Sequence, residues 1–129
     1  VQADGAAAST IIRGLVDFAV IGADRIAKNG DTANKIGSLG VALACKEAGI
    51  PFMVAAPSST VDITYENGDS IEIELRSPEE VTSLNGVQTA PELDRGFNPA
   101  FDVTPAKFIS AVVTEHGVAE PIRGESVEG

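Results

Sequence analysis

Apolar residues in the first half of the chain follow a helix, strand, helix, strand order. The alanine-rich segment from Ala6 to Leu15 predicts a helix that Gly14 interrupts. The near-continuous apolar run from Asp17 to Gly22 is typical of a strand that is buried on both faces. A second apolar run, Phe52 to Ala56, stops at Pro57 and predicts another buried strand.

A helix is predicted between these strands, from Ala33 to Ala48, because its apolar residues recur at helical spacing. Asp31 or Thr32 can cap its amino end, and Gly49 follows its last turn. A strand, a helix and a strand joined by short links form a βαβ unit with parallel strands. The pattern therefore predicts an α/β fold, with a parallel sheet and helices on both faces.

Two glycines lie inside the predicted helix, at Gly37 and Gly40. Glycine destabilises a helix interior, so this pair predicts close packing against a neighbouring element.

The pattern changes after Pro57. Residues Thr64 to Leu75 alternate between apolar and polar around Asn67-Gly68, which predicts a β-hairpin insertion. A helical turn is expected at Pro78 to Val81, and a loop from Asn85 to Gly96.

A last helix is predicted from Pro105 to Thr114. Proline suits the first position of a helix, and Thr104 precedes it as a cap. Gly117 follows the helix end, and the tail after Pro121 is expected to be frayed.

The chain carries 19 acidic and 9 basic residues, a net charge of -10, and is 43% hydrophobic. This hydrophobic content predicts a packed core. The acidity argues against a nucleic-acid partner, because phosphate backbones need clustered lysine and arginine. A simple interpretation of the acidity is solubility, and a small anionic ligand remains compatible with it.

The single cysteine, Cys45, cannot form an intramolecular disulfide, which favours a reducing compartment. Neither a signal peptide nor an apolar run of transmembrane length is present, so no membrane partner is expected. The sequence starts at Val1 without an initiator methionine, and we expect a fragment or a processed chain.

The polar segment from Gly22 to Gly37, GADRIAKNGDTANKIG, links the first strand to the predicted helix. In such sheets, ligands bind beyond the carboxyl ends of the strands, which is where Asp24 falls. Asn34 and Lys35 fall in the expected first helical turn, where backbone N–H groups favour an anion. The layout suits a phosphorylated small molecule beside a proton-transfer group. Equally, Asp24 can simply hold the loop by accepting backbone hydrogen bonds.

Three other residues are weaker candidates. His116 is expected at a helix carboxyl end, where a cation suits the dipole. Cys45 is interpreted as a buried inert thiol rather than a nucleophile. Asp102 can face the same crevice as Asp24 or staple a loop. No nucleotide-binding glycine motif and no cluster with metal-ligand spacing is present.

The blocks GADRIAKNGDTANKIG, IPFMVAAPSSTVD, IEIELRSPEEVT, NGVQTAP and FNPAFDVTP carry a resemblance over nearly the whole chain. Their order and spacing resemble those of methylthioribose-1-phosphate isomerases of methionine salvage. That family is grouped with the alpha, beta and delta regulatory subunits of translation initiation factor 2B, and with ribose-1,5-bisphosphate isomerases.

The resemblance implies a Rossmann-like fold and an aldose-ketose isomerisation of 5-methylthioribose 1-phosphate to 5-methylthioribulose 1-phosphate. It implies a cytoplasmic homodimer that needs no metal and no organic cofactor. By resemblance, Asp24 is the catalytic general acid/base, and Asn34 and Lys35 bind the phosphorylated pentose.

The sequence departs from this family in two respects. Cys45 does not match the family's catalytic cysteine, which lies upstream of the segment that the chain resembles, and the phosphate-binding arginines are missing. We therefore expect residues 1–129 to be a C-terminal Rossmann-like catalytic domain, an incomplete one, inactive without the N-terminal portion of the same protein. The alternatives are a non-catalytic regulatory subunit and an isomerase of another ribose phosphate.

Overall fold

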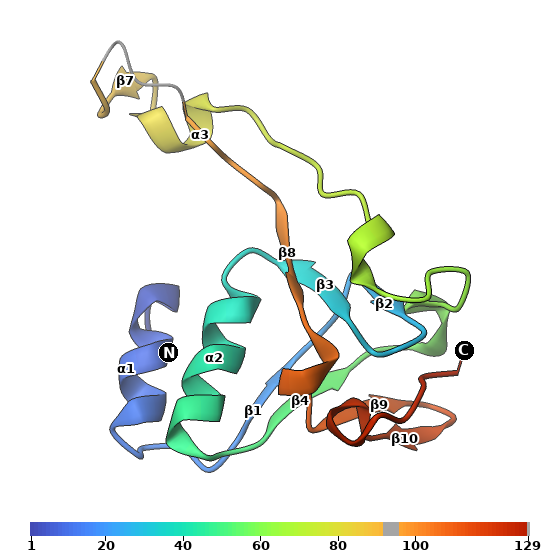
Figure 1. Ribbon diagram of the computed structural model, residues 1–129. Helices are drawn as coiled ribbons and strands as arrows, with labels where there is room; N and C mark the ends of the chain where they lie inside the picture. Colours follow the sequence, from blue (N-terminus) through green and yellow to red (C-terminus); the bar gives the residue numbers. More distant parts are fainter. Residues whose placement is uncertain (92–95, 129) are drawn as a thin grey trace.

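The computed structural model describes residues 1–91 and 96–128, which form a mixed α/β fold (Figure 1). The main sheet has the strand order β1-β4-β9-β10. Its strands are β1 (Ala19–Ile21), β4 (Phe52–Ala55), β9 (Ala111–Thr114) and β10 (Gly117–Ala119). The first three are parallel and β10 is antiparallel to β9, which confirms the predicted α/β class with a parallel sheet.

A second sheet has the strand order β5-β2-β3-β8, and its two central strands come between β1 and the following helix in the sequence. Its strands are β2 (Arg25–Ala27), β3 (Thr32–Lys35), β5 (Val61–Asp62) and β8 (Phe101–Thr104). Strand β3 pairs antiparallel with β2 on one side and with β8 on the other. The polar segment after β1 is therefore mostly a hairpin, which sequence analysis treated as a loop.

Two helices pack beside each other along the main sheet, α1 (Ala7–Ile12) and α2 (Ser38–Ala48) (Figure 1). The core under α2 holds the fully buried side chains of Phe52, Val54 and Val112. Left-handed backbone at Gly49 ends α2, as expected from a glycine at this position.

Helix α2 begins at Ser38, five residues later than predicted, because Thr32–Lys35 pairs with β2 and β8. The proposed caps Asp31 and Thr32 are therefore wrong. The inference of close packing at the two helix glycines is also wrong. A Cβ added at Gly37 or at Gly40 would meet nothing within 4 Å.

Part of the segment between β5 and β8, two strands of the second sheet, projects from the body of the molecule as an arm (Figure 1). It contains α3 (Glu79–Thr82), as predicted, and the small hairpin β6 (Ser83–Leu84) and β7 (Val87–Gln88). The hairpin predicted over residues 64–75 is absent, and a short 3-10 helix, Gly68–Ser70, lies there. Part of the loop predicted from Asn85 to Gly96, residues 92–95, lies outside the described residues.

The helix predicted from Pro105 to Thr114 is wrong as well. A 3-10 turn, Ala106–Phe108, leads directly into β9, whose β-branched residues pair with β4 in the core. The tail is packed rather than frayed up to residue 128. Pro121–Arg123 forms a 3-10 turn, and the N–H of the buried Val127 donates to the Lys28 carbonyl at 2.7 Å.

Further 3-10 turns lie at Asp4–Ala6 and Ser58–Thr60. In the described part of the chain, no helix is long and apolar enough to cross a membrane.

Candidate functional site

Asp24 lies beyond the carboxyl end of β1, as the sequence predicted, and its side chain is exposed. Its backbone N–H donates to the carbonyl oxygen of Ala33 at 2.8 Å. This bond holds the Asp24 backbone against Ala33 of β3, one residue before Asn34. The Asp24 carboxylate makes no hydrogen bond within residues 1–91 and 96–128, so the alternative prediction, that it holds the loop by accepting backbone hydrogen bonds, is wrong.

Asn34 and Lys35 end strand β3 rather than opening a helix, which corrects their predicted position. The Asn34 Nδ2 group donates to Ser38 Oγ at 2.9 Å, and Ser38 Oγ donates to the Lys35 carbonyl at 2.8 Å. Ser38 is buried, so this chain of bonds fixes the link from β3 into α2. The Asn34 side-chain oxygen accepts no hydrogen bond in the described part of the chain and can accept one from a ligand.

The amino end of α2 is occupied by Asp102, from strand β8. Its carboxylate accepts hydrogen bonds from the N–H groups of Gly37, at 2.9 Å, and Leu39, at 3.2 Å. The sequence predicted that an anion binds the free N–H groups of the first helical turn, which it placed at Asn34 and Lys35. In the structure the helix starts later, and Asp102 occupies its free N–H groups. The predicted anion corner is therefore filled by the protein itself, and the stapling interpretation of Asp102 is confirmed.

Lys35 lines two cavities. One, of about 220 Å³, lies between the end of β1 at Ile21 and the start of α2. The other, of about 420 Å³, is shared with Arg76 and Glu80 from the arm. Lys35 therefore places a positive charge beside the carboxyl edge of the sheet without the help of a helix end.

Arg25, directly after Asp24, is held by contacts that the sequence left unassigned. Its guanidinium lies 2.9 Å from the Asp62 carboxylate and 5.6 Å from the centre of the Tyr65 ring. Hydrogen bonds from Thr64, and then the charge of Arg25, lower the pKa of Asp62. This ion pair joins β2 to β5 and fixes the backbone that carries Asp24.

Two residues that sequence reasoning missed connect the other strand ends of this edge. Both carboxylate oxygens of Glu115, after β9, accept from the Ser58 N–H, after β4. This contact lowers the pKa of Glu115. The sequence could have indicated these two residues only by their positions, because each follows a buried strand of the parallel sheet.

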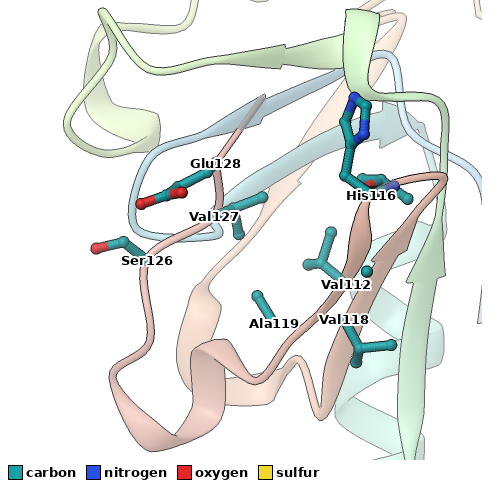
Figure 2. A pocket seen from close by; sticks show the side chains of 9 residues that line it. Val112, His116, Val118, Ala119, Ser126, Val127 and Glu128 are labelled. Carbon is teal, nitrogen blue, oxygen red and sulfur yellow. Dashed lines mark hydrogen bonds between the residues drawn. The ribbon is translucent and has the colours of Figure 1, made fainter.

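The remaining candidates are Cys45 and His116. Cys45 is fully buried, as predicted, and burial raises the pKa of its thiol, which is typical of an unreactive cysteine. His116 lies in the turn between β9 and β10, not at a helix end. His116 lines a cavity of about 260 Å³ together with the C-terminal segment. Figure 2 shows the Glu128 carboxylate pointing away from the His116 ring.

The structure thus brings the three predicted residues to one edge of the two sheets: Asp24, Asn34 and Lys35. They offer an exposed carboxylate, an amide oxygen and an ammonium group, which suit proton transfer on a polar anionic substrate. No group of three or more His, Cys, Asp or Glu side chains suited to a metal ion lies among the residues that the structure describes.

The chain is similar in sequence to proteins of known function. The chain is 50% identical over 125 residues to a methylthioribose-1-phosphate isomerase of Acetivibrio thermocellus, covering 97% of this chain and 36% of that protein. It is 58% identical over 112 residues to one of Citrifermentans bemidjiense, covering 87% and 32%. The chain therefore spans about a third of the length of these relatives.

Solved structures agree on the fold. The crystal structure of 5-methylthioribose 1-phosphate isomerase from Pyrococcus horikoshii OT3 matches with a TM-score of 0.85 and 48% identity, covering 93% of this chain and 33% of that one. The delta subunit of translation initiation factor 2B from A. fulgidus matches with a TM-score of 0.84 and 38% identity, covering 93% and 35%. The family model described as the initiation factor 2 subunit family matches residues 3–121, and the chain belongs to that family.

Proposed function

We propose that this chain is the carboxyl-terminal catalytic part of an aldose-ketose isomerase that converts 5-methylthioribose 1-phosphate to 5-methylthioribulose 1-phosphate in methionine salvage. The observation that supports it best is the exposed Asp24 carboxylate beside Asn34 and Lys35 at the carboxyl edge of the sheet. The names of the relatives that are 50% and 58% identical point to the same reaction.

The reaction moves hydrogen without any net oxidation. The sugar ring opens when its ring oxygen is protonated and the bond from that oxygen to C1 breaks. The hydrogen on C2 then moves to C1 and the C2 hydroxyl group releases its proton, so that C2 becomes the ketone and the proton taken up by the ring oxygen is balanced. Asp24 is suited to these transfers because a carboxyl group can donate a proton and take one back. The phosphate stays on C1 throughout.

Asn34 and Lys35 hold the substrate in this proposal. The Lys35 ammonium group attracts the phosphate dianion, and the free side-chain oxygen of Asn34 accepts a hydrogen bond from a sugar hydroxyl. The Ser38 bridge fixes both residues before substrate arrives, which reduces the ordering cost of binding.

We further propose that residues 1–129 are an incomplete Rossmann-like domain and inactive alone. Strand β1 lies at the edge of its sheet, and the apolar side chains of Phe18 and Val20 are each 53% exposed. An open strand edge beside exposed apolar side chains suits the docking of further strands. The N-terminal portion of the same protein would cover this edge and bring the groups missing from the site, the family's catalytic cysteine among them.

The assembled protein is proposed to be a cytoplasmic homodimer. The arm carries several exposed apolar side chains, which is typical of a surface that meets a partner: Leu75, Val81, Leu84 and Val87. A second copy of the chain is the partner that we propose for it.

The alternative function is a non-catalytic regulatory subunit, supported by the similarity to the delta subunit of initiation factor 2B. An isomerase for another ribose phosphate is also possible in chemical terms. The pocket around C5 of the sugar separates the two isomerases, since an apolar wall would suit a methylthio group and a cationic one a second phosphate.

One experiment separates these functions. The chain is produced both alone and with its upstream portion, and turnover is measured with methylthioribose 1-phosphate and with ribose 1,5-bisphosphate. We expect turnover of the first substrate only, and only with the upstream portion. Asp24→Asn should lower kcat by roughly a hundredfold or more, as expected for loss of a general acid/base.

Asp17→Asn is the matched control, because this exposed aspartate lies before β1 on the same chain. Full turnover by Asp24→Asn removes the acid/base role. Full turnover by the chain alone contradicts the proposal that the domain is incomplete, and no turnover of either substrate by the longer protein favours the regulatory subunit.

A further inference from the structure

A cavity of about 350 Å³ lies at the opposite edge of the main sheet from Asp24. Pro51 and Ser110, which line it, come directly before β4 and β9, so the cavity is at the amino ends of these strands. Its other walls are the carboxyl end of α2 and the 3-10 turn Ala106–Phe108. The proposed isomerase site has no part in it.

The walls of this cavity are largely apolar. The Phe108 ring and Ile50 pack against the core at its base, and Ile122 is 52% exposed beside it. The lining contains no carboxylate, although acidic residues outnumber basic ones by 19 to 9 in the chain. An apolar hollow without acidic groups is an uncommon environment on so acidic a protein.

Two lysines converge on this hollow. The ammonium nitrogens of Lys46 and Lys107 lie 4.9 Å and 5.2 Å from the centre of the same Phe108 ring. Neither has a carboxylate within 4.0 Å among the described residues, whereas four other basic side chains do: Arg25, Lys28, Arg76 and Arg123. Two like charges held at one ring repel each other, so an anion between them is favourable.

Ser110 adds a neutral donor to the same wall. Its hydroxyl oxygen accepts a hydrogen bond from the Phe52 N–H at 3.3 Å. The hydroxyl hydrogen has no acceptor in the described part of the chain and is free to point into the cavity.

We propose that this cavity binds a small organic anion with an apolar body, such as an aryl carboxylate. The apolar body lies against Phe108, Ile50 and Ile122, and the carboxylate lies between Lys46 and Lys107 with Ser110 as an added donor. Apolar lining with a few convergent polar groups is the usual composition of a small-molecule site.

The test is a titration of the chain with naphthoate, followed through backbone amide shifts in NMR spectra. The expected result is saturable shifts at Lys46, Lys107, Phe108 and Ser110. The neutral analogue naphthylmethanol should bind far more weakly. Raising the ionic strength from about 0.05 M to about 0.5 M should weaken naphthoate binding, since salt screens exposed charges.

The double variant Lys46→Met with Lys107→Met keeps the apolar stems and removes both charges. We expect it to weaken naphthoate binding by roughly tenfold or more, since each ammonium contributes roughly three- to fivefold near a protein surface. The matched control Lys28→Met removes an exposed lysine elsewhere and should bind as the unchanged chain does.

Lys46→Arg with Lys107→Arg keeps both charges and should retain binding. If the methionine variant does not fold, this pair and the salt dependence decide the outcome. Equal binding of the neutral analogue, shifts that map to another surface, or full affinity in a folded methionine variant overturns the proposal. Binding of an acidic peptide but not of naphthoate also overturns it and indicates a protein partner.

Discussion

At the scale of single residues, the carboxylate of Asp102 decides what the start of α2 can do. It satisfies two helical N–H groups that would otherwise be available to a phosphate. The positive charge near the site therefore comes from Lys35. The position of Lys35 depends on the connection from β3 to α2, which the hydrogen bonds of Asp102 stabilise. An internal carboxylate and a substrate anion cannot both occupy the same helix end.

Replacing Asp102 by alanine should destabilise the protein by about 1 kcal/mol, the usual effect of losing a helix cap. Urea unfolding followed by circular dichroism measures this change. In the longer protein, the same substitution should raise KM more than it lowers kcat, because it loosens Lys35 and Asn34 without touching Asp24.

Asp17→Ala serves as the control, since it removes an exposed aspartate from the same chain. Equal stability of the Asp102 and Asp17 variants would show that the cap contributes nothing.

The identities of Asp24, Asn34 and Lys35 as candidates came from the sequence, because their positions relative to a buried strand are local information. The role of Asp102 could not be foreseen with the same certainty. Its bond to the Gly37 N–H joins residues 65 positions apart, and no local pattern reports such a contact. The sequence therefore located the candidate residues better than their hydrogen-bond partners.

At the scale of elements, the first two strands of the main sheet were predictable because β1 and β4 are apolar runs. Strand β3 was not, because Thr32–Lys35 is a short polar segment that becomes a strand only by pairing with β2 and β8. Thr104 and Pro105 were interpreted as the cap and first residue of a helix, but sheet pairing by β9 overrode that helix. Pairing with distant strands, rather than local propensity, determined the secondary structure of these segments.

Two glycines, one in the turn between β2 and β3 and one in α2, should respond to alanine in opposite ways. Gly30 has a φ of 99°, and an added Cβ would lie 2.5 Å from the Pro121 Cβ. Gly30→Ala should therefore destabilise the chain by roughly 2 kcal/mol or more, through strain and overlap.

Gly40 lies in α2 with open space where a Cβ would be. Gly40→Ala should stabilise the chain by roughly 0.5–1 kcal/mol, since alanine is the better helix former. Thermal unfolding of both variants measures the contrast. A destabilised Gly40→Ala protein would show that this glycine has a packing role after all.

At the scale of the whole molecule, the contact between Glu115 and Ser58 links the ends of β4 and β9 and makes stability depend on pH. The pKa of Glu115 is lowered in the folded protein from its ordinary 4.5, chiefly by the Ser58 N–H. A lowered folded pKa gives stability that is present above pH 4.5 and is lost as the pH falls through the lower, folded value.

Glu115→Gln should therefore flatten the acid side of the stability curve. Urea unfolding midpoints measured from neutral pH down to acid pH provide the comparison. Glu125→Gln, a change of one exposed glutamate in the tail, should leave the shape of the curve unaltered. If both variants show the same pH dependence as the unchanged chain, the Glu115 contact does not contribute.

The strand order also has a consequence for how the chain is made. Strand β4 pairs with β1, which precedes it, and with β9, which follows after the whole arm. During synthesis the ribosome releases β4 long before β9, so one edge of the innermost strand stays open while the arm is translated. Unpaired strand edges recruit other chains, and long-range pairing is slow. Nascent chains of this protein therefore pass through an aggregation-sensitive interval that ends only when Ala111–Thr114 emerges.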